Sequence, residues 1–342
     1  MFTIGIDVHY RTSNVCILDA RGKRIKEARV KSSQLVDFLQ KQPAPRQICY
    51  EASLGYGACY DRLAPLAERV AVAHPGQLRL IFRSKRKNDR VDARKLAMLL
   101  FMDEVPTIYV PSIDYRTWRK LIEMRERRVA DRTRTKNRLR GLLRGHGVAA
   151  PNRIHLWTRK GLAWLREVTL PTPDAGLERD LLLDDLARQN ATLERVEDRL
   201  KEIADSHPGV HLLRTIPGVG IRTAEAVMAY IADPKRFRRS RQVGCYFGLV
   251  PCQDQSADRD RLGHITREGP GTVRRLLVEA SWQAIRRDAR VRSFFERVHR
   301  NDPRRKKIAL VATAHYLVRC MHAMLSTGEC WRETEPVNQA AA

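Results

Sequence analysis

Short apolar runs alternate with helical patterns through the first 105 residues, and this alternation restricts what the chain can fold into. Three strands come first, followed by helix, strand, helix and strand, which is typical of a mixed sheet covered by helices. The sequence therefore predicts an α/β domain at this end of the chain. The predicted strands are 2–8, 13–18, 24–30, 47–50 and 70–73, and the predicted helices are 33–40, 56–67 and 89–101.

Two of these strands carry a carboxylate. Asp7 interrupts the first apolar run, and Glu51 ends the fourth. A carboxylate in an apolar segment is costly unless it is paired or bound to a metal ion, and no basic residue shares the strand of Asp7. Asp89 and Asp92 are three residues apart, so on a helix they share one face. Four converging carboxylates suit a two-metal site, and a ligand set made only of oxygen favours Mg²⁺ or Mn²⁺.

Asp89 and Asp92 have a simpler alternative explanation, because they stand among basic residues and could form ordinary ion pairs with Arg86, Lys87, Arg90 and Arg94. The charge arrangement of the stretch 83–92 as a whole is suited to binding a phosphate backbone beside a metal ion. Without the acids inside it, the same run would indicate a solvated loop. Its candidate phosphate contacts are Arg83, Lys85, Arg86, Lys87 and Arg90.

The charge of the chain indicates a polyanionic partner. Lys and Arg number 64 against 39 Asp and Glu, which gives a formal net charge of +25 and a pI near 10.4. Nucleic acid fits this balance better than a membrane does, and no run of about 18 apolar residues indicates a transmembrane span. The seven cysteines include no Cys-x-x-Cys pair, which argues for reduced thiols in a cytosol and against a zinc site. Composition alone leaves open a non-catalytic nucleic-acid binder.

The middle of the chain is predicted to be helical. Residues 116–147 combine helically spaced apolar residues with twelve Arg or Lys against three acids, so this helix can contact phosphate. From 182 onward the pattern is heptad, with nine acids and five bases between 178 and 206. A helical hairpin within one chain and a coiled coil between subunits both explain the heptads. The heptad positions are Leu182, Gln189, Val196 and Ile203 in one row, and Leu186, Leu193 and Leu200 in the other.

The part from residue 207 onward is predicted to be mainly α-helical, with loops that contain Gly and Pro. The turn 217–220, Pro-Gly-Val-Gly, leads into a helix and resembles the turn of helix-hairpin-helix modules; a plain turn without a ligand is the alternative. A polar loop, 248–259, contains Ser256, which by itself indicates only a turn residue. The candidate nucleic-acid contacts in this part are Gly218, Gly220, His264, Arg267, Arg274 and Arg275.

Together these stretches resemble the DEDD transposases of insertion sequences, which have a RuvC-like N-terminal part and act as RNA-guided recombinases. Nearly the whole chain takes part in the resemblance. The matching segments are Gly5-Ile6-Asp7-Val8-His9, Tyr50-Glu51-Ala52, Asn88-Asp89-Arg90-Val91-Asp92-Ala93, Pro217-Gly218-Val219-Gly220, Gly248-Leu249-Val250-Pro251 and Gly263-His264-Ile265-Thr266-Arg267-Glu268-Gly269.

The resemblance implies a ribonuclease-H-like domain over 1–105, a basic helix and coiled-coil region over 106–206, a C-terminal transposase domain over 207–334 and a tail over 335–342. It implies that Asp7, Glu51, Asp89 and Asp92 bind two Mg²⁺ ions and that a serine is the nucleophile. That serine is Ser256, although Ala257 follows it where the family usually has glycine. Cys252 and Thr266 are the alternative nucleophiles.

The implied partners are target and donor DNA, a structured non-coding guide RNA, and further copies of the chain in a dimer or tetramer. The implied location is a prokaryotic cytoplasm, at the nucleoid during transposition. Two other functions stay open. A RuvC-type endonuclease would use the same acids with water as its nucleophile but needs no serine domain, whereas a non-catalytic binder would leave Asp7 and Glu51 unexplained.

Overall fold

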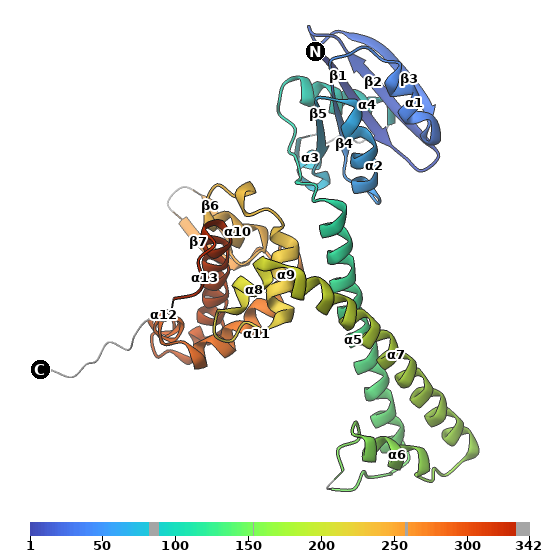
Figure 1. The fold of residues 1–342 in the computed structure, drawn as a ribbon, viewed down its shortest axis with the longest axis vertical. Coiled ribbons are helices and arrows are strands. Elements are labelled where there is room, and N and C mark those ends of the chain that lie inside the picture. Colours follow the sequence, from blue (N-terminus) through green and yellow to red (C-terminus); the bar gives the residue numbers. More distant parts are fainter. Residues whose placement is uncertain (82–88, 153, 257–258, 333–342) are drawn as a thin grey trace, which may run out of the picture. The chain divides into compact units, whose positions relative to one another are not determined.

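The computed structural model describes residues 1–81, 89–152, 154–256 and 259–332, and at positions 89, 90, 256, 259 and 260 it describes the backbone alone. The chain forms two units, Met1–Arg116 and Thr117–Ala342, which are described separately below (Figure 1). The finer division of the helical part into 106–206 and 207–334 stays a prediction.

A five-stranded mixed sheet forms the centre of the first unit (Figure 1). Its strand order is β3-β2-β1-β4-β5, in which β1 is antiparallel to β2 and parallel to β4. The predicted α/β character is confirmed, and all five predicted strands are present. They are β1 (Phe2–Val8), β2 (Thr12–Leu18), β3 (Arg24–Lys31), β4 (Arg46–Glu51) and β5 (Arg69–Ala73).

Helices cover both faces of this sheet. On one face, side chains such as Ile6 and Tyr50 pack against the first two helices. The other face is covered by α4, which was predicted with the same bounds. Helix α3 was not predicted, because Leu78 is its one buried residue and no apolar stripe marks it. The helices are α1 (Leu35–Gln40), α2 (Tyr56–Leu63), α3 (Pro75–Ile81) and α4 (Asp89–Phe101), with 3₁₀ turns at Ser32–Gln34 and Ala64–Leu66.

Helix α4 lies directly on β1. Ala93 and Ala97 pack with Cys16 in a buried cluster, and a Cβ atom at Gly5 would collide with the backbone of both alanines. Only glycine therefore permits this close approach of helix to strand. The contact fixes where the first turn of α4 lies relative to the end of β1.

Two long helices form a hairpin in the second unit (Figure 1). They are α5 (Ile113–Gly145) and α7 (Pro173–Ser206), with the short α6 (Arg159–Glu167) packed against both. Gln189 donates a hydrogen bond to Thr135 at 3.0 Å, and Arg125 pairs with Glu197 at 2.7 Å, so side chains connect the two helices. The heptad residues Leu186, Leu193 and Leu200 are 2%, 3% and 0% exposed within one chain. Of the two explanations for the heptads, the intrachain hairpin is the one found here.

The remainder of the second unit is a helical bundle, as predicted, except for one β-hairpin. Strands β6 (Pro251–Ser256) and β7 (Arg259–Ile265) pair antiparallel where a loop was predicted. Their described side chains are exposed or only partly buried, so no alternation of apolar residues marked them as strands. The helices are α8 (Pro208–Arg214), α9 (Ile221–Ile231), α10 (Ser240–Tyr246), α11 (Gly271–Arg287), α12 (Ala289–His299) and α13 (Lys306–Thr327), with 3₁₀ turns at Pro234–Arg236 and Pro303–Arg305.

One helical stretch within the described residues, Pro303–Thr327, is long and apolar enough to cross a membrane by length and composition alone. Half of its most apolar window is buried inside the protein, as in the core helix of a bundle. Ala314, Leu317 and Val318 are fully buried there.

Candidate active site and nucleic-acid surfaces

The carboxyl ends of β1 and β4 bring Asp7 and Glu51 to one edge of the sheet. Ile6 pairs with Tyr50 in the parallel register, so Asp7 and Glu51 are the next two residues along these strands. Asp7 comes two residues after Gly5, and Glu51 comes two residues after Cys49. Gly5 and Cys49 both face α4, so the two carboxylates also lie on the α4 side of the sheet. Neighbouring strands are about 4.8 Å apart, a spacing at which two carboxylates can share a cation.

The first turn of α4 lies toward the same edge. The ring of Phe101, the last residue of α4, lies against Gly22 in the turn between β2 and β3, beside the start of β1. The helix therefore begins toward the opposite edge, where β1 and β4 end. Asp89 is its first residue, described by its backbone alone, and Asp92 follows one turn later. Asp92 is 40% exposed and accepts a hydrogen bond from Lys95 at 3.3 Å.

Asp7 has a basic neighbour that its strand does not contain. The His9 ring lies just beyond β1, and its Nε2 is 3.0 Å from Asp7 Oδ2. The Asp7 side chain is 16% exposed, so the carboxylate is reachable from solvent. Cys49, two residues before Glu51, is fully buried against α4, and burial raises the pKa of its thiol to about 12.

The carboxylates suit a hard divalent cation by their chemistry, since such ions prefer oxygen ligands. Among the residues whose side chains are described, no group of three or more His, Cys, Asp or Glu could hold a metal ion. The side chain of Asp89 is outside that set. The structure thus brings Asp7, Glu51 and the start of α4 to one edge, and the four-carboxylate ligand set stays a prediction.

Ser256 is the last residue of β6, at the tip of the β6–β7 hairpin, and its backbone pairs with Arg259. Ala257 lies outside the described residues. Of the two alternative nucleophiles, Cys252 is exposed on β6. Thr266 is not suited to the role, because its hydroxyl oxygen is buried with no hydrogen-bond partner in the described part of the chain.

The turn between α8 and α9 contains Gly218 and Gly220. Gly218 has φ +93° and lies so close to Ala284 of α11 that a Cβ would reach the backbone at 2.5 Å. Packing within the chain therefore explains this glycine. Gly220 is the N-cap of α9, and a Cβ there would meet open space, so packing does not explain this glycine.

The predicted basic contacts differ in how much of their charge is already engaged. Arg275 pairs with Glu126 and with Glu279, and Arg274 donates to the carbonyl oxygens of Phe247 and Gly269 at 3.2 Å. Burial and Arg267 lower the pKa of Arg274 from its usual value. His264 and Arg267 are exposed. Arg83, Lys85, Arg86 and Lys87 lie outside the described residues, and Arg90 is described by its backbone alone.

Helix α5 offers fewer available charges than its composition suggests. Arg119 donates to the carbonyl oxygens of Ala229 and Tyr230, and Arg125 pairs with Glu197. The exposed Lys and Arg residues of α5 without an ion pair in the described structure are Lys120, Arg138, Arg140 and Arg144, of which Arg140 lies over the Trp157 ring.

Comparisons with known proteins identify the family. A DEDD transposase model of the IS110 group matches residues 4–147, and a model described as the transposase IS116/IS110/IS902 family matches residues 210–296. The transposase for insertion sequence element IS1111A of Coxiella burnetii is 27% identical over 83% of this chain and 78% of its own length. A probable family 20 transposase of Pseudomonas aeruginosa is 27% identical over 96% of this chain and 98% of its own length. The chain belongs to the DEDD-type transposases of insertion sequences.

This transposase is accordingly an enzyme that cuts and joins DNA by metal-dependent phosphoryl transfer. The two matched segments contain the sheet edge with Asp7 and Glu51, and the β6–β7 hairpin with Ser256. The RuvC-type and non-catalytic alternatives do not account for the second matched segment.

The transposase also buries a carboxylate that the sequence reasoning missed. Glu225 lies in the apolar helix α9, is 1% exposed and pairs with Arg222 at 2.8 Å. Burial raises its pKa to about 7 despite that pair. An acid inside an apolar run was the signal that identified Asp7, and the same signal marks Glu225.

We expect Glu225 to make the stability of the fold depend on pH. Between pH 4.5 and 7 the folded chain keeps a proton that the unfolded chain releases, so stability is lost as pH rises through this window. Glu225→Gln should remove this loss and be the more stable protein at pH 8, by about 1–3 kcal/mol. Urea unfolding at pH 5, 6, 7 and 8 measures it, with the exposed Glu279→Gln as control. Equal pH slopes for wild type and Glu225→Gln would contradict the assignment.

Proposed function

We propose that this transposase cuts and exchanges DNA strands through a phosphoserine intermediate, with Ser256 as nucleophile and Asp7, Glu51, Asp89 and Asp92 as Mg²⁺ ligands. The observation that carries the proposal is the placement of Asp7 and Glu51 on adjacent parallel strands, at the edge toward which α4 begins. The strand order, with three antiparallel strands followed by two parallel ones, supports a ribonuclease-H-like domain.

Each step of the proposed chemistry keeps the number of phosphoester bonds constant. The carboxylates would hold a divalent cation, which would polarise the scissile phosphate when bound. The Ser256 oxygen attacks phosphorus, an Oγ–P bond forms, and the bond to the 3′-oxygen breaks. The serine proton is released and the departing 3′-oxygen takes up a proton. A 3′-hydroxyl of another strand then attacks the phosphoserine and restores the free serine. No high-energy cofactor is required.

We propose a structured guide RNA and two DNA segments, target and donor, as the partners. The net charge of +25 and the exposed Lys120, Arg138 and Arg144 of α5 support a polyanionic partner. No element of the described residues is required to read bases if pairing with the RNA selects the sites. The bacterial relatives support action in a prokaryotic cytoplasm.

We propose further that the transposase works as a dimer or tetramer. The heptad leucines of α7 are occupied within the chain, so assembly would use another surface of the hairpin. Leu177 and Leu181 lie one turn apart on α7 and are 59% and 56% exposed. These two leucines are the apolar surface that a second copy could cover.

The proposal is tested by trapping the protein on DNA. Purified protein, guide RNA and a labelled DNA containing the element's end are mixed with Mg²⁺ and then denatured. We expect a covalent protein–DNA species that survives denaturation and disappears after phosphodiesterase treatment. Cleavage without any adduct would instead support the RuvC-type mechanism with water. Binding without cleavage would support a non-catalytic role.

A further inference from the structure

A row of three polar side chains extends from Asp7 across the face of the sheet that lies under α4. Asp7 pairs with Asn14 in the antiparallel register of β1 and β2, and Asn14 pairs with Arg29 in the register of β2 and β3. Residues paired across strands point to the same face, so all three lie on the side of Gly5 and Cys16. Arg29 is two strand spacings from Asp7, about 10 Å between backbones.

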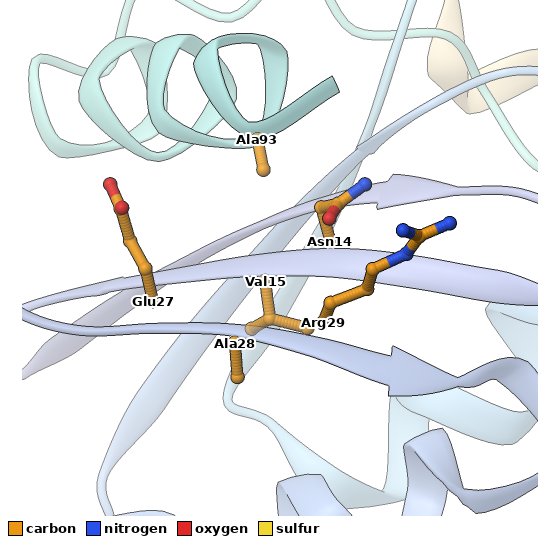
Figure 2. Close-up of a pocket in the computed structure, with 6 residues that line it drawn as sticks. All are labelled: Asn14, Val15, Glu27, Ala28, Arg29 and Ala93. Atoms are coloured by element: carbon orange, nitrogen blue, oxygen red, sulfur yellow. The ribbon is translucent and has the colours of Figure 1, made fainter. Parts of the chain in front are cut away.

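A cavity of about 240 Å³ opens beside this row, between β2, β3 and α4. Figure 2 shows Asn14 and Arg29 together at one end of it, Glu27 at the other, and Ala93 of α4 on the opposite wall. Pockets for drug-sized ligands begin at about 300 Å³, so this cavity is of a size for one phosphodiester group rather than a cofactor. Glu27 pairs with Arg24 at 2.7 Å, and Arg29 is the cation among the residues that line the cavity.

The guanidinium of Arg29 is held but not neutralised. Its Nε and Nη2 donate to Thr12 Oγ1 at 3.4 and 3.3 Å, which restrains the group. Nη1 has no hydrogen-bond partner, and Arg29 has no ion pair, with any residue that the structure describes. The neutral Asn14 lies between Arg29 and Asp7 in the strand registers, so the guanidinium and the carboxylate do not form an ion pair with each other. An arginine held in this way presents the donors that bind phosphate oxygens most strongly.

We propose that Arg29 and Asn14 form a subsite for a phosphodiester of the DNA strand being cut, next to the scissile phosphate. The subsite serves the metal edge at Asp7 and therefore rests on the proposed function. Arg29 binds the neighbouring phosphate and thereby sets the register of the strand, while the carboxylates act on the phosphate beside it. The occupant is DNA because the cavity opens beside the edge at which the strand is cut.

The test replaces single phosphates near the cleavage site by uncharged methylphosphonates, in the presence of guide RNA and Mg²⁺. At one flanking position we expect wild type to cut about ten-fold or more slowly, the effect of losing one charge-assisted contact. Arg29→Gln should cut all substrates at this lower rate and be insensitive to the replacement at that position. Arg29→Lys, which keeps the charge but not the fork, should be intermediate. Arg21→Gln, in the turn at the far end of β2 and β3, is the matched control and should behave as wild type.

The salt dependence of DNA binding gives a second readout that a merely structural role would not move. Arg29→Gln should lower the slope of log affinity against log salt by about 0.7–0.9, the value for one lost phosphate contact. If wild type cuts and Arg29→Gln equals it on every substrate, the subsite is wrong while the proposed function stands. If Asp7→Asn still cuts, the proposed function itself fails.

Discussion

Asp7→Asn is expected to reduce DNA cleavage and strand exchange to background while the protein still folds and binds RNA. The amide has nearly the shape of the carboxylate but no charge, so it can still accept a hydrogen bond from His9 and cannot hold a divalent cation in the same way. Cleavage of labelled DNA in Mg²⁺ measures the loss, thermal unfolding measures the fold, and a filter-binding assay measures RNA affinity. Removal of the metal ion by a chelator should give wild type the same phenotype.

Asp37→Asn provides the matched control for this change. Asp37 is exposed in the first turn of α1, on the face of the sheet opposite to α4, and the same substitution there should leave cleavage unchanged. If purified Asp7→Asn exchanges DNA strands in Mg²⁺ at the wild-type rate, the proposed two-metal mechanism is wrong. A loss of both folding and cleavage would instead assign Asp7 to the stability of the sheet edge.

The edge that carries Asp7 and Glu51 could be predicted because an acid inside an apolar run is visible in the sequence itself. The strands could be predicted because short apolar runs fill the core on both faces of the sheet. Arg29 and Asn14 could not be found in this way. Their relation to Asp7 depends on the registers of two antiparallel pairings, and a shift of one residue would turn both side chains to the other face.

In the second unit, sequence patterns predicted the helices but not which elements they pack against. A heptad pattern indicates that a helix has a partner but not which one. Leu182 and Leu186 of α7 pack in one cluster with Leu139 and Leu143 of α5 in the same chain. The described side chains of the β6–β7 hairpin are exposed or partly buried, so its strands are set by backbone pairing, which leaves no apolar period in the sequence. Glu225 carries the same signal as Asp7, an acid within an apolar run, and that signal marks it in the sequence as a buried carboxylate.

Ser256→Ala is expected to eliminate both recombination and the covalent protein–DNA species, while guide RNA and DNA remain bound. Loss of one hydroxyl at the tip of an exposed hairpin should change stability by no more than about 0.5 kcal/mol. Loss of the nucleophile removes the whole covalent route, because no other group supplies the Oγ–P bond. Metal binding at Asp7 and Glu51 should be unchanged, since these residues belong to the other unit.

The neighbouring Gln255→Ala is the control for Ser256→Ala, because it removes the exposed polar side chain of the preceding residue on β6 and should still form the adduct. Mixing Ser256→Ala with Asp7→Asn protein asks whether one chain must supply both groups: recovered recombination would mean that different protomers can supply them. An adduct formed by Ser256→Ala alone would show that another residue is the nucleophile. Cys252 would then be the next candidate, because it is exposed on the same strand, whereas the Thr266 oxygen is buried.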